Sequence, residues 1–323
     1  MILITGINGE MGNALIKKLS QIDKRKIIGL DIKPVNAEIE SYLDTVYIGD
    51  IKDNQLIKQI FSENKITEVY HLAAILSTKA ESIPFLSHEI NVNGFLNLMS
   101  SIQESNELIK FFFASSIAVY CVNEKNSSNI TEDQFCNPNN MYGCNKLYCE
   151  KLGAYFSRYS ESIKNLDFRA IRFSGIISAN TLPQGGTSDY APEMIHMASQ
   201  NKNYTCFVNS DSCIPFMVMS DAVNAIISIM KVDKKSLSRD VYHIQAFTPS
   251  VNDIYKKIIS YFPSFKLDYN INPQRQKLID SWPSHLDQQA AQTDWGWKPK
   301  YNFDRAFDEY LIPKIKEYYK DKR

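Results

Sequence analysis

The chain has 323 residues, and its 36 lysines and arginines are balanced by 36 aspartates and glutamates, so the formal net charge is zero. With 44% hydrophobic and 22% charged residues, it has the composition of a globular protein, which excludes collagen-like, fibrous and disordered chains. The balanced charge and the lack of a basic tract argue against nucleic acid as a partner. The longest apolar-rich run, residues 111–122, is too short to cross a bilayer, so no membrane association is predicted.

Six cysteines stand at positions 121, 136, 144, 149, 206 and 213, and none forms a CxxC pair or another metal-ligand spacing. We therefore predict no metal site and interpret the cysteines as free thiols in a reducing compartment. A first strand that begins at Ile2 leaves no room for a signal peptide in this sequence. The expected location is the cytoplasm, with a targeting segment removed before this start as the alternative.

In the first half, short apolar runs alternate with amphipathic stretches. Strands are predicted at residues 2–5, 26–31, 45–48, 68–72, 111–115 and 168–173, and helices at 12–20, 55–62, 89–103 and 141–160. The strands are rich in β-branched residues and apolar on both faces, which is typical of a parallel sheet covered by helices. The alternation predicts an α/β fold with a Rossmann-type doubly wound sheet and a binding crevice at the carboxyl ends of its strands.

The length exceeds what one hydrophobic core usually organises, so we expect two lobes. Residues 1–174 are expected to form the Rossmann domain. Beyond Gly175, prolines and glycines interrupt the pattern, and residues 175–323 are expected to form mainly a smaller, mixed α/β substrate-binding lobe, with about 214–246 returning to the Rossmann domain. The polar stretch 123–140 is predicted to be a surface loop, and Asp221 is expected to cap the helix that follows it.

Three glycines, Gly6, Gly9 and Gly12, follow the first strand directly and open the first helix. This spacing permits a tight turn and close approach of the backbone to a pyrophosphate, and the helix N-terminus supplies N–H donors for the anion. Asp31 ends the second strand, 19 residues after Gly12, where its carboxylate can accept hydrogen bonds from both ribose hydroxyls. Because a carboxylate repels a 2′-phosphate, the sequence predicts NAD rather than NADP as the cofactor of this domain.

The GxxGxxG spacing resembles that of the short-chain dehydrogenase/reductase superfamily. Residues 49–51 (GDI), residues 71–74 (HLAA) and Asn91 match its extended branch, the NAD-dependent epimerases and dehydratases. We interpret His71 as a structural histidine at a strand end, with a catalytic base as the alternative. The resemblance implies that NAD contacts Gly6, Asn8, Gly9, Glu10, Met11, Gly12, Asp31, Ile32, Asp50, Ile51, Leu72, Ala73, Ala74, Asn91, Ser115, Tyr142, Lys146 and Phe173.

Tyr142 and Lys146 stand four residues apart, so one helical turn places both on the same face. The same spacing recurs in the C-terminal tail at residues 310 and 314, but only the first pair follows a predicted strand that ends in two serines. A serine, a tyrosine and a lysine in this order resemble the catalytic triad of the superfamily, which implies Ser116, Tyr142 and Lys146 as catalytic residues. Ser115 is the alternative if the alignment shifts by one residue.

The chemistry accounts for these residue types. A tyrosine with a pKa of ~10 is too weakly ionised to act as a base at neutral pH. We expect the Lys146 ammonium and the positive nicotinamide to lower the pKa of Tyr142, which then takes the proton of a substrate hydroxyl as hydride leaves the adjacent carbon. Ser116 is expected to hydrogen-bond the substrate oxygen, and Lys146 also to bind the nicotinamide ribose.

Three segments resemble the epimerase-like L-threonine 3-dehydrogenases: LAAILS at 72–77, GGTSDYA at 185–191, and SWP at 281–283 followed by DWGWKP at 294–299. The resemblance implies that Ser77 and Thr187 contact the polar groups of the amino acid and that Trp282 closes the pocket. Small hydroxyl side chains and one indole suit a small zwitterion better than a bulky sugar nucleotide. A turn role for Thr187 and a packing role for Trp282 are the alternatives. We interpret residues 295 and 297, both tryptophan, as structural.

The leading hypothesis is NAD-dependent oxidation of L-threonine at its 3-hydroxyl to 2-amino-3-oxobutanoate, as in threonine catabolism. One alternative is a nucleotide-sugar epimerase or dehydratase, which needs cations around a pyrophosphate; the second half offers Arg239 and Arg275 for this role. The other is a non-catalytic NAD-sensing protein. Residues 172–175 read RFSG where the threonine enzymes usually have RYPG, which leaves the contact of Ser174 open. By analogy with similar enzymes, the helices at 89–103 and 141–160 are expected to form a homodimer interface.

Overall fold

The chain folds into two compact units. A computed structural model describes residues 1–122, 129–179, 181–183 and 186–320. The first unit comprises Met1–Ser116, Met141–Arg172 and Val223–Tyr242, and the second comprises Ile117–Asn140, Phe173–Ala222 and His243–Arg323. The chain passes repeatedly between the units, so neither is a single stretch of sequence.

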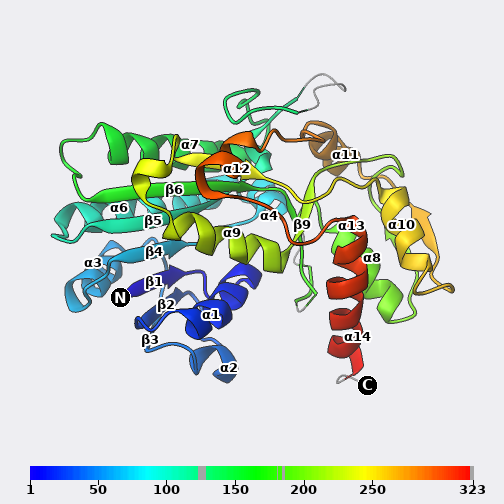
Figure 1. The fold of residues 1–323 in the computed structure, drawn as a ribbon, viewed down its shortest axis with the longest axis horizontal. Coiled ribbons are helices and arrows are strands. Elements are labelled where there is room, and N and C mark those ends of the chain that lie inside the picture. Colours follow the sequence, from blue (N-terminus) through cyan, green and yellow to red (C-terminus); the bar gives the residue numbers. More distant parts are fainter. Residues whose placement is uncertain (123–128, 180, 184–185, 321–323) are drawn as a thin grey trace. The chain divides into compact units, whose positions relative to one another are not determined.

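The first unit is built around a seven-stranded sheet in the order β10-β6-β5-β4-β1-β2-β3 (Figure 1). The pairs β1–β2, β1–β4, β2–β3 and β4–β5 are parallel. The predicted α/β, Rossmann-type fold is therefore confirmed. The strands are β1 (Ile2–Thr5), β2 (Ile27–Asp31), β3 (Thr45–Ile48), β4 (Glu68–His71), β5 (Ile109–Ser116), β6 (Leu166–Phe173) and β10 (Val241–Ile244).

Helices follow most of these strands. They are α1 (Glu10–Ile22), α2 (Ala37–Glu40), α3 (Asn54–Glu63), α4 (Ser77–Ser82), α5 (Pro84–His88), α6 (Gly94–Glu104), α7 (Met141–Arg158) and α9 (Met219–Lys231). The helix predicted at 89–103 instead begins with a π-helical turn at Glu89–Asn93, and α6 starts only at Gly94. The sequence analysis missed α4 and α5 because each is too short to show a hydrophobic period.

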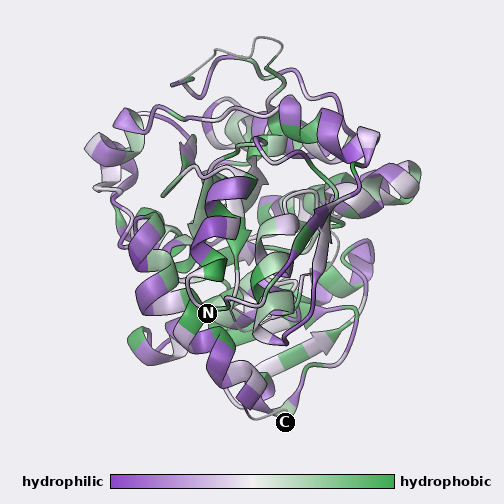
Figure 2. Ribbon diagram, turned by 90° about the vertical axis from the view of Figure 1, so that its right-hand side faces the viewer, coloured by the Kyte–Doolittle hydropathy of each residue, from purple (hydrophilic) through white to green (hydrophobic). Residues whose placement is uncertain are grey.

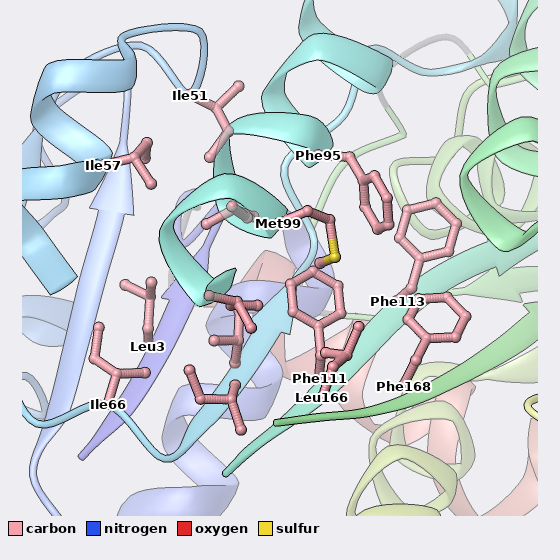
Figure 3. Close-up of a cluster of buried hydrophobic side chains, with 14 of the residues drawn as sticks. Leu3, Ile51, Ile57, Ile66, Phe95, Met99, Phe111, Phe113, Leu166 and Phe168 are labelled. Carbon is pink, nitrogen blue, oxygen red and sulfur yellow. The ribbon is translucent and has the colours of Figure 1, made fainter. Parts of the chain in front are cut away.

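The core on one face of the sheet is aromatic. Phe95 of α6 meets Phe111 edge to face with ring centroids 5.7 Å apart, and Phe168 of β6 stacks on Phe111 at 6.1 Å. Figure 3 shows these rings with Phe113 beneath α6. Strands β1 and β6 are buried along their whole length, as in a sheet covered by two layers of helices, whereas the edge strand β3 is partly exposed. Figure 2 shows green, hydrophobic stretches among the strands and on the helices.

The second unit contains two small parallel sheets and several helices. Strands β7 (Gly175–Ile177) and β9 (Phe216–Val218) form one sheet, and β8 (Tyr204–Cys206) and β11 (Leu267–Tyr269) form the other. Its helices are α8 (Tyr190–Ser199), α10 (Val251–Ile259), α11 (Pro273–Asp280), α12 (Gln289–Trp295), α13 (Phe303–Arg305) and α14 (Ile312–Lys320), with a π-helical turn at Ala306–Leu311. Of the helices described here, none is both long and apolar enough to span a membrane.

Of two local predictions for this unit, the second needs correction. Residues 123–128 of the predicted surface loop lie outside the described residues; the remainder, 129–140, forms no regular helix or strand and half of its residues are exposed, although Ile130, Glu132 and Asn140 are buried. Asp221 was expected to cap a helix, but it lies inside α9 and accepts hydrogen bonds from the backbone N–H groups of Lys300 and Tyr301, both at 3.2 Å. A carboxylate that ties two distant segments cannot be recognised from its neighbours in sequence.

Candidate active site

The glycine turn after β1 is too tight for side chains. Gly6 has a φ of +76°, and a Cβ there would lie 2.6 Å from the backbone nitrogen of Ala73. A Cβ on Gly12 would lie 2.4 Å from the carbonyl oxygen of Gly6. Because neither residue has a side chain, the amino end of α1 can lie close to the ends of β1 and β4. The backbone N–H groups of the helix end are then available to bind an anion. Gly9 is the N-cap of α1, and Glu10 and Met11 form its first turn.

Asp31 stands at the carboxyl end of β2 and faces this turn. Its Oδ2 accepts a hydrogen bond from the backbone N–H of Asn8 at 2.9 Å, and its Oδ1 accepts one from Lys33 at 3.3 Å. Asp31 is half-buried, and the following Ile32 is 62% exposed. The turn and the carboxylate are therefore adjacent, as dinucleotide binding requires.

The end of β4 is fixed by a buried hydrogen-bonded pair. His71 Nδ1 lies 2.8 Å from Thr5 Oγ1, which also accepts from the N–H of Ala73. Burial, with a smaller effect of Lys146, lowers the pKa of His71 to about 3. His71 is therefore a neutral structural residue that holds Leu72, Ala73 and Ala74 against β1, as the sequence analysis interprets it.

Three further predicted cofactor residues have structural contacts. Asn91, in the π-helical turn, accepts from the N–H of Ile75 at 2.7 Å and donates to its carbonyl oxygen at 3.1 Å, which fixes the loop after β4. Ile51 is 6% exposed, and its side chain packs in the core cluster. Asp50 is partly exposed and accepts from the N–H of Lys52 at 2.9 Å. Because the side chain of Ile51 packs in the core, mainly the backbone atoms of this residue are available to contact a ligand.

Tyr142 and Lys146 lie together at the start of α7. The Lys146 ammonium is 5.5 Å from the centre of the Tyr142 ring and 4.6 Å from that of Phe113. It donates to the carbonyl oxygen of Ala114 at 2.7 Å, so the pair lies against the carboxyl end of β5. Lys146 is 4% exposed, whereas Tyr142 is partly accessible.

The two serines at the end of β5 have different surroundings. Ser115 is 3% exposed, and its hydroxyl donates to the Glu150 carboxylate. Ser116 is half-buried, and successive strand residues point to opposite faces. The hydroxyl of Ser115 is thus occupied inside the protein, which favours Ser116 over the one-residue alternative as the group that meets a substrate.

The pKa of Tyr142 departs from the expected direction. The sequence analysis expects Lys146 to contribute to a lowered value, but in the protein alone burial raises the pKa of Tyr142 above its ordinary value. Burial also lowers the pKa of Lys146, to about 8, against opposing effects of Cys149 and Glu150. In both groups the exclusion of water penalises the charged form. Such perturbed groups in contact are typical of functional sites.

Helix α4 places Ser77 against the start of α7. Glu81, one turn after Ser77 on the same face of α4, accepts from the backbone N–H of Met141 at 2.6 Å, directly before Tyr142. Ser77 is 8% exposed. The sequence analysis missed Glu81, because a helix cap supplied by a distant segment leaves no local signal.

Thr187 lies in a braced loop of the second unit. Asp189 accepts from the N–H of Gly186 at 2.6 Å, so it shapes the loop, while Gly185 lies outside the described residues. Arg275 of α11 donates to the carbonyl oxygen of Gly186, with its guanidinium carbon 3.2 Å from the centre of the Phe207 ring. Thr187 itself is 1% exposed.

The buried polar atoms of this unit that have no hydrogen-bond partner among the described residues include Ser174 Oγ, Tyr190 Oη and Trp282 Nε1. Trp282 follows α11 and is 8% exposed. Burying a polar group without a hydrogen-bond partner costs free energy, and such a group often binds a ligand or a water molecule. Trp295 and Trp297 pack on each other with ring centroids 5.7 Å apart, and Trp297 donates to Gln288, which fits the structural role predicted for both. Phe173, the last residue of β6, is also buried.

A buried ion pair beneath the site escaped the sequence analysis. Arg172 of β6 donates to Glu150 of α7 from Nε at 2.9 Å and from Nη2 at 2.6 Å. The available signal was the repeat of Tyr142, Lys146 and Glu150 at intervals of four, which places all three on one helix face. Strand β6 is buried along its whole length, and an arginine in such a strand also implies a buried partner.

Comparison with known proteins agrees with this geometry. The model of the NAD dependent epimerase/dehydratase family matches residues 2–244. The chain belongs to this family. It is 32% identical over 308 residues to the mitochondrial L-threonine 3-dehydrogenase of Bos taurus, which covers 94% of this chain and 79% of that protein.

Solved structures extend the similarity to the whole fold. The L-threonine 3-dehydrogenase of Trypanosoma brucei superposes with a TM-score of 0.90 at 31% identity, over 99% of this chain and 98% of that one. A monomeric L-threonine 3-dehydrogenase from a metagenome superposes with a TM-score of 0.88 at 33% identity, over 98% and 100%. Membership of the family implies an oxidoreductase-type enzyme with a nicotinamide cofactor, and the glycine turn with Asp31 fits such a cofactor.

Proposed function

We propose that the protein oxidises L-threonine at its 3-hydroxyl to 2-amino-3-oxobutanoate, with NAD as the hydride acceptor. The observation that supports this most is the Tyr142–Lys146 pair at the end of β5, in a chain similar along almost its whole length to L-threonine 3-dehydrogenases. The first unit is proposed to bind NAD, and the second to provide most of the substrate contacts.

NAD is proposed over NADP because of Asp31. Its carboxylate is held by the N–H of Asn8 at the end of β2, where it accepts from ribose hydroxyls and repels a 2′-phosphate. The N–H groups at the start of α1 would hold the pyrophosphate. Bound NAD supplies a positively charged ring that accepts the hydride.

In the reaction, Tyr142 takes the hydroxyl proton of threonine while the C3–H bond breaks and its electron pair leaves as hydride. The carbonyl of the product forms from the C3–O bond, and Ser116 donates a hydrogen bond to that oxygen. Lys146 stabilises the Tyr142 phenolate by its charge, at a ring-centre distance of 5.5 Å. General acid–base assistance of this kind contributes ~10²–10⁴-fold.

In this proposal Tyr142 and Lys146, whose ammonium lies 5.5 Å from the centre of the phenol ring, act as one coupled titrating pair. Because the pKa of Lys146 is about 8 and that of Tyr142 is raised, the pair loses its first proton near pH 8, and the reactive form is the fraction in which tyrosine rather than lysine has lost it. Oxidation is therefore expected to rise with pH through about 8 and then level off.

For the substrate, Ser77 and Thr187 are proposed to bind the polar groups of the amino acid, and the unpartnered Nε1 of Trp282 to face the pocket. Binding of a nucleotide sugar is disfavoured because Arg275 already binds Gly186 and Phe207, so it does not add a cation for a pyrophosphate. Self-association is proposed through the helical segments at 89–103 and 141–160. Tyr148 and Tyr155 of α7 are each 50% exposed, and Phe85 of α5, just before residue 89, is 84% exposed.

The test mixes the purified protein with NAD and L-threonine and follows NADH by absorbance, with L-serine, L-allo-threonine, NADP and UDP-galactose as comparisons. We expect steady NADH formation with threonine and NAD. Interconversion of the UDP-sugar without net NADH would replace the proposal with an epimerase function.

A further inference from the structure

Glu150 is the third residue of the α7 face that carries Tyr142 and Lys146. It is 1% exposed, and a charged group so deeply buried requires partners. Arg172 supplies a two-point ion pair from β6, and Ser115 of β5 donates its hydroxyl. The carboxylate therefore binds both strands that lie next to the start of α7.

Two consecutive residues of β5 are bonded to two residues one turn apart on α7. The carbonyl oxygen of Ala114 accepts from Lys146 at 2.7 Å, and the hydroxyl of Ser115 donates to Glu150. A shift of α7 by a single residue, about 1.5 Å along its axis, breaks both contacts. These two contacts therefore fix the position of Tyr142 along the axis of α7 relative to Ser116, the residue that follows Ser115 in β5.

Glu150 also controls the charges near Lys146. Titratable or charged groups around this ammonium are Tyr142, Cys149 and Glu150 on its own helix, His71 from β4, and Arg172 from β6 through Glu150. Glu150 raises the pKa of Lys146, while burial lowers it more strongly. Arg172, which is 3% exposed, is neutralised by the carboxylate.

We propose that Glu150 is a positioning residue for the Tyr142–Lys146 pair. It fixes α7 against the end of β5, and it prevents the buried charge of Arg172 from repelling the Lys146 ammonium. The kinetic consequence rests on the proposed function, but the effect on Lys146 requires no substrate.

Removing the charge of Glu150 is expected to change the pH–rate profile in two ways. The midpoint moves to lower pH, which favours the reaction at low pH, and the plateau rate falls. With Gln at this position, the ammonium form of Lys146 becomes less stable, so the Tyr142–Lys146 pair loses its first proton at a lower pH. The same change converts the phenolate–ammonium form into phenol and amine, so the plateau rate falls. We expect a fall of about 10²-fold, the effect of a misplacement near 1 Å. A merely structural residue would lower the amount of folded protein without moving the midpoint pH.

The experiment titrates Lys146 in the ligand-free protein. Lysines are labelled with ¹³C at Cε, the Lys146 signal is assigned by its loss in Lys146→Arg, and circular dichroism verifies folding. Wild type is expected to titrate near the pKa of about 8, Glu150→Gln at a lower pH, and the double variant Glu150→Gln/Arg172→Gln close to wild type. Arg172→Gln alone, which leaves the carboxylate unneutralised, is expected to titrate at a higher pH. Glu104→Gln, at an exposed ion pair of α6 with Lys58, is the matched control and should behave as wild type.

An unchanged Lys146 titration in folded Glu150→Gln, or equal midpoints in Glu150→Gln and Arg172→Gln, would overturn the proposal. If Glu150→Gln does not fold, the upward shift in Arg172→Gln and the return in the double variant decide the matter. Because the titration needs no substrate, its result stands even if threonine is not oxidised. In NADH formation against pH, Glu150→Gln is expected to lower both the midpoint pH and the plateau rate, and an unchanged midpoint would contradict the proposal.

Discussion

Replacing Gly12 by alanine is expected to weaken NAD binding about tenfold or more. The new Cβ would lie 2.4 Å from the carbonyl oxygen of Gly6 and 2.9 Å from Cα of Ile7. Because an ordinary contact begins near 3.4 Å, the first turn of α1 must move away from β1 by about 1 Å. Overpacking of this kind costs about 1–3 kcal/mol, and about 1.4 kcal/mol corresponds to a tenfold change in affinity. The displaced N–H groups no longer meet the pyrophosphate as they do in wild type.

The assay is isothermal titration of NAD into wild type, Gly12→Ala, Gly9→Ala and Gly296→Ala, with thermal unfolding measured in parallel. Gly9→Ala should lose less affinity, because its Cβ would lie 3.2 Å from the Gly6 oxygen. Gly296 has a φ of +70° and open space around its Cβ position, so its variant should lower the Tm and leave the Kd for NAD unchanged. A folded Gly12→Ala protein with the Kd of wild type would show that the cofactor is not held by this turn.

Three further variants test the other parts of the site. Asp31→Asn keeps an acceptor for the N–H of Asn8 but loses the charge. The preference for NAD over NADP should therefore fall by roughly tenfold, since a hydrogen bond to a charged group contributes about 1.5–3 kcal/mol. An unchanged ratio of the kcat/KM values for NAD and NADP would contradict the assignment of Asp31. Tyr142→Phe should lower kcat by at least ~10²-fold with the Kd for NAD unchanged, and full turnover in this variant would refute the role of the phenol. Arg275→Gln removes the hydrogen bond to the carbonyl oxygen of Gly186. The KM for the amino acid should then rise roughly tenfold or more, while NAD binding stays as in wild type. A loss confined to NAD affinity would show that the Thr187 loop does not bind the amino acid.

The sequence predicted the first unit well because its signals are local. Apolar runs identified β1, β3 and β4 to within a residue, and Gly6, Gly12 and Asp31 lie together as expected. Each of these features follows from the order of residues along one βαβ unit. The pairing of Tyr142 with Lys146 is also local, since one helical turn separates them.

The features that were missed depend on contacts between distant segments. Glu81 caps α7 from 60 residues away, and Glu150 meets Arg172 across the sheet. Asp221 was predicted to cap the helix next to it in sequence, but it accepts hydrogen bonds from a distant segment instead. In the protein without NAD, the pKa of Tyr142 is raised for a related reason: the penalty of burial depends on the packed structure around the phenol, whereas the sequence shows only its charged neighbour.

The most direct test of the central claim follows one hydrogen atom. L-Threonine with deuterium at C3 is incubated with NAD and the protein, and the recovered NADH is analysed by mass spectrometry. The account predicts one deuterium in each NADH, formed in equal amount to 2-amino-3-oxobutanoate or its decarboxylation product. NADH without deuterium, or threonine returned unchanged while a nucleotide sugar is converted, would contradict it.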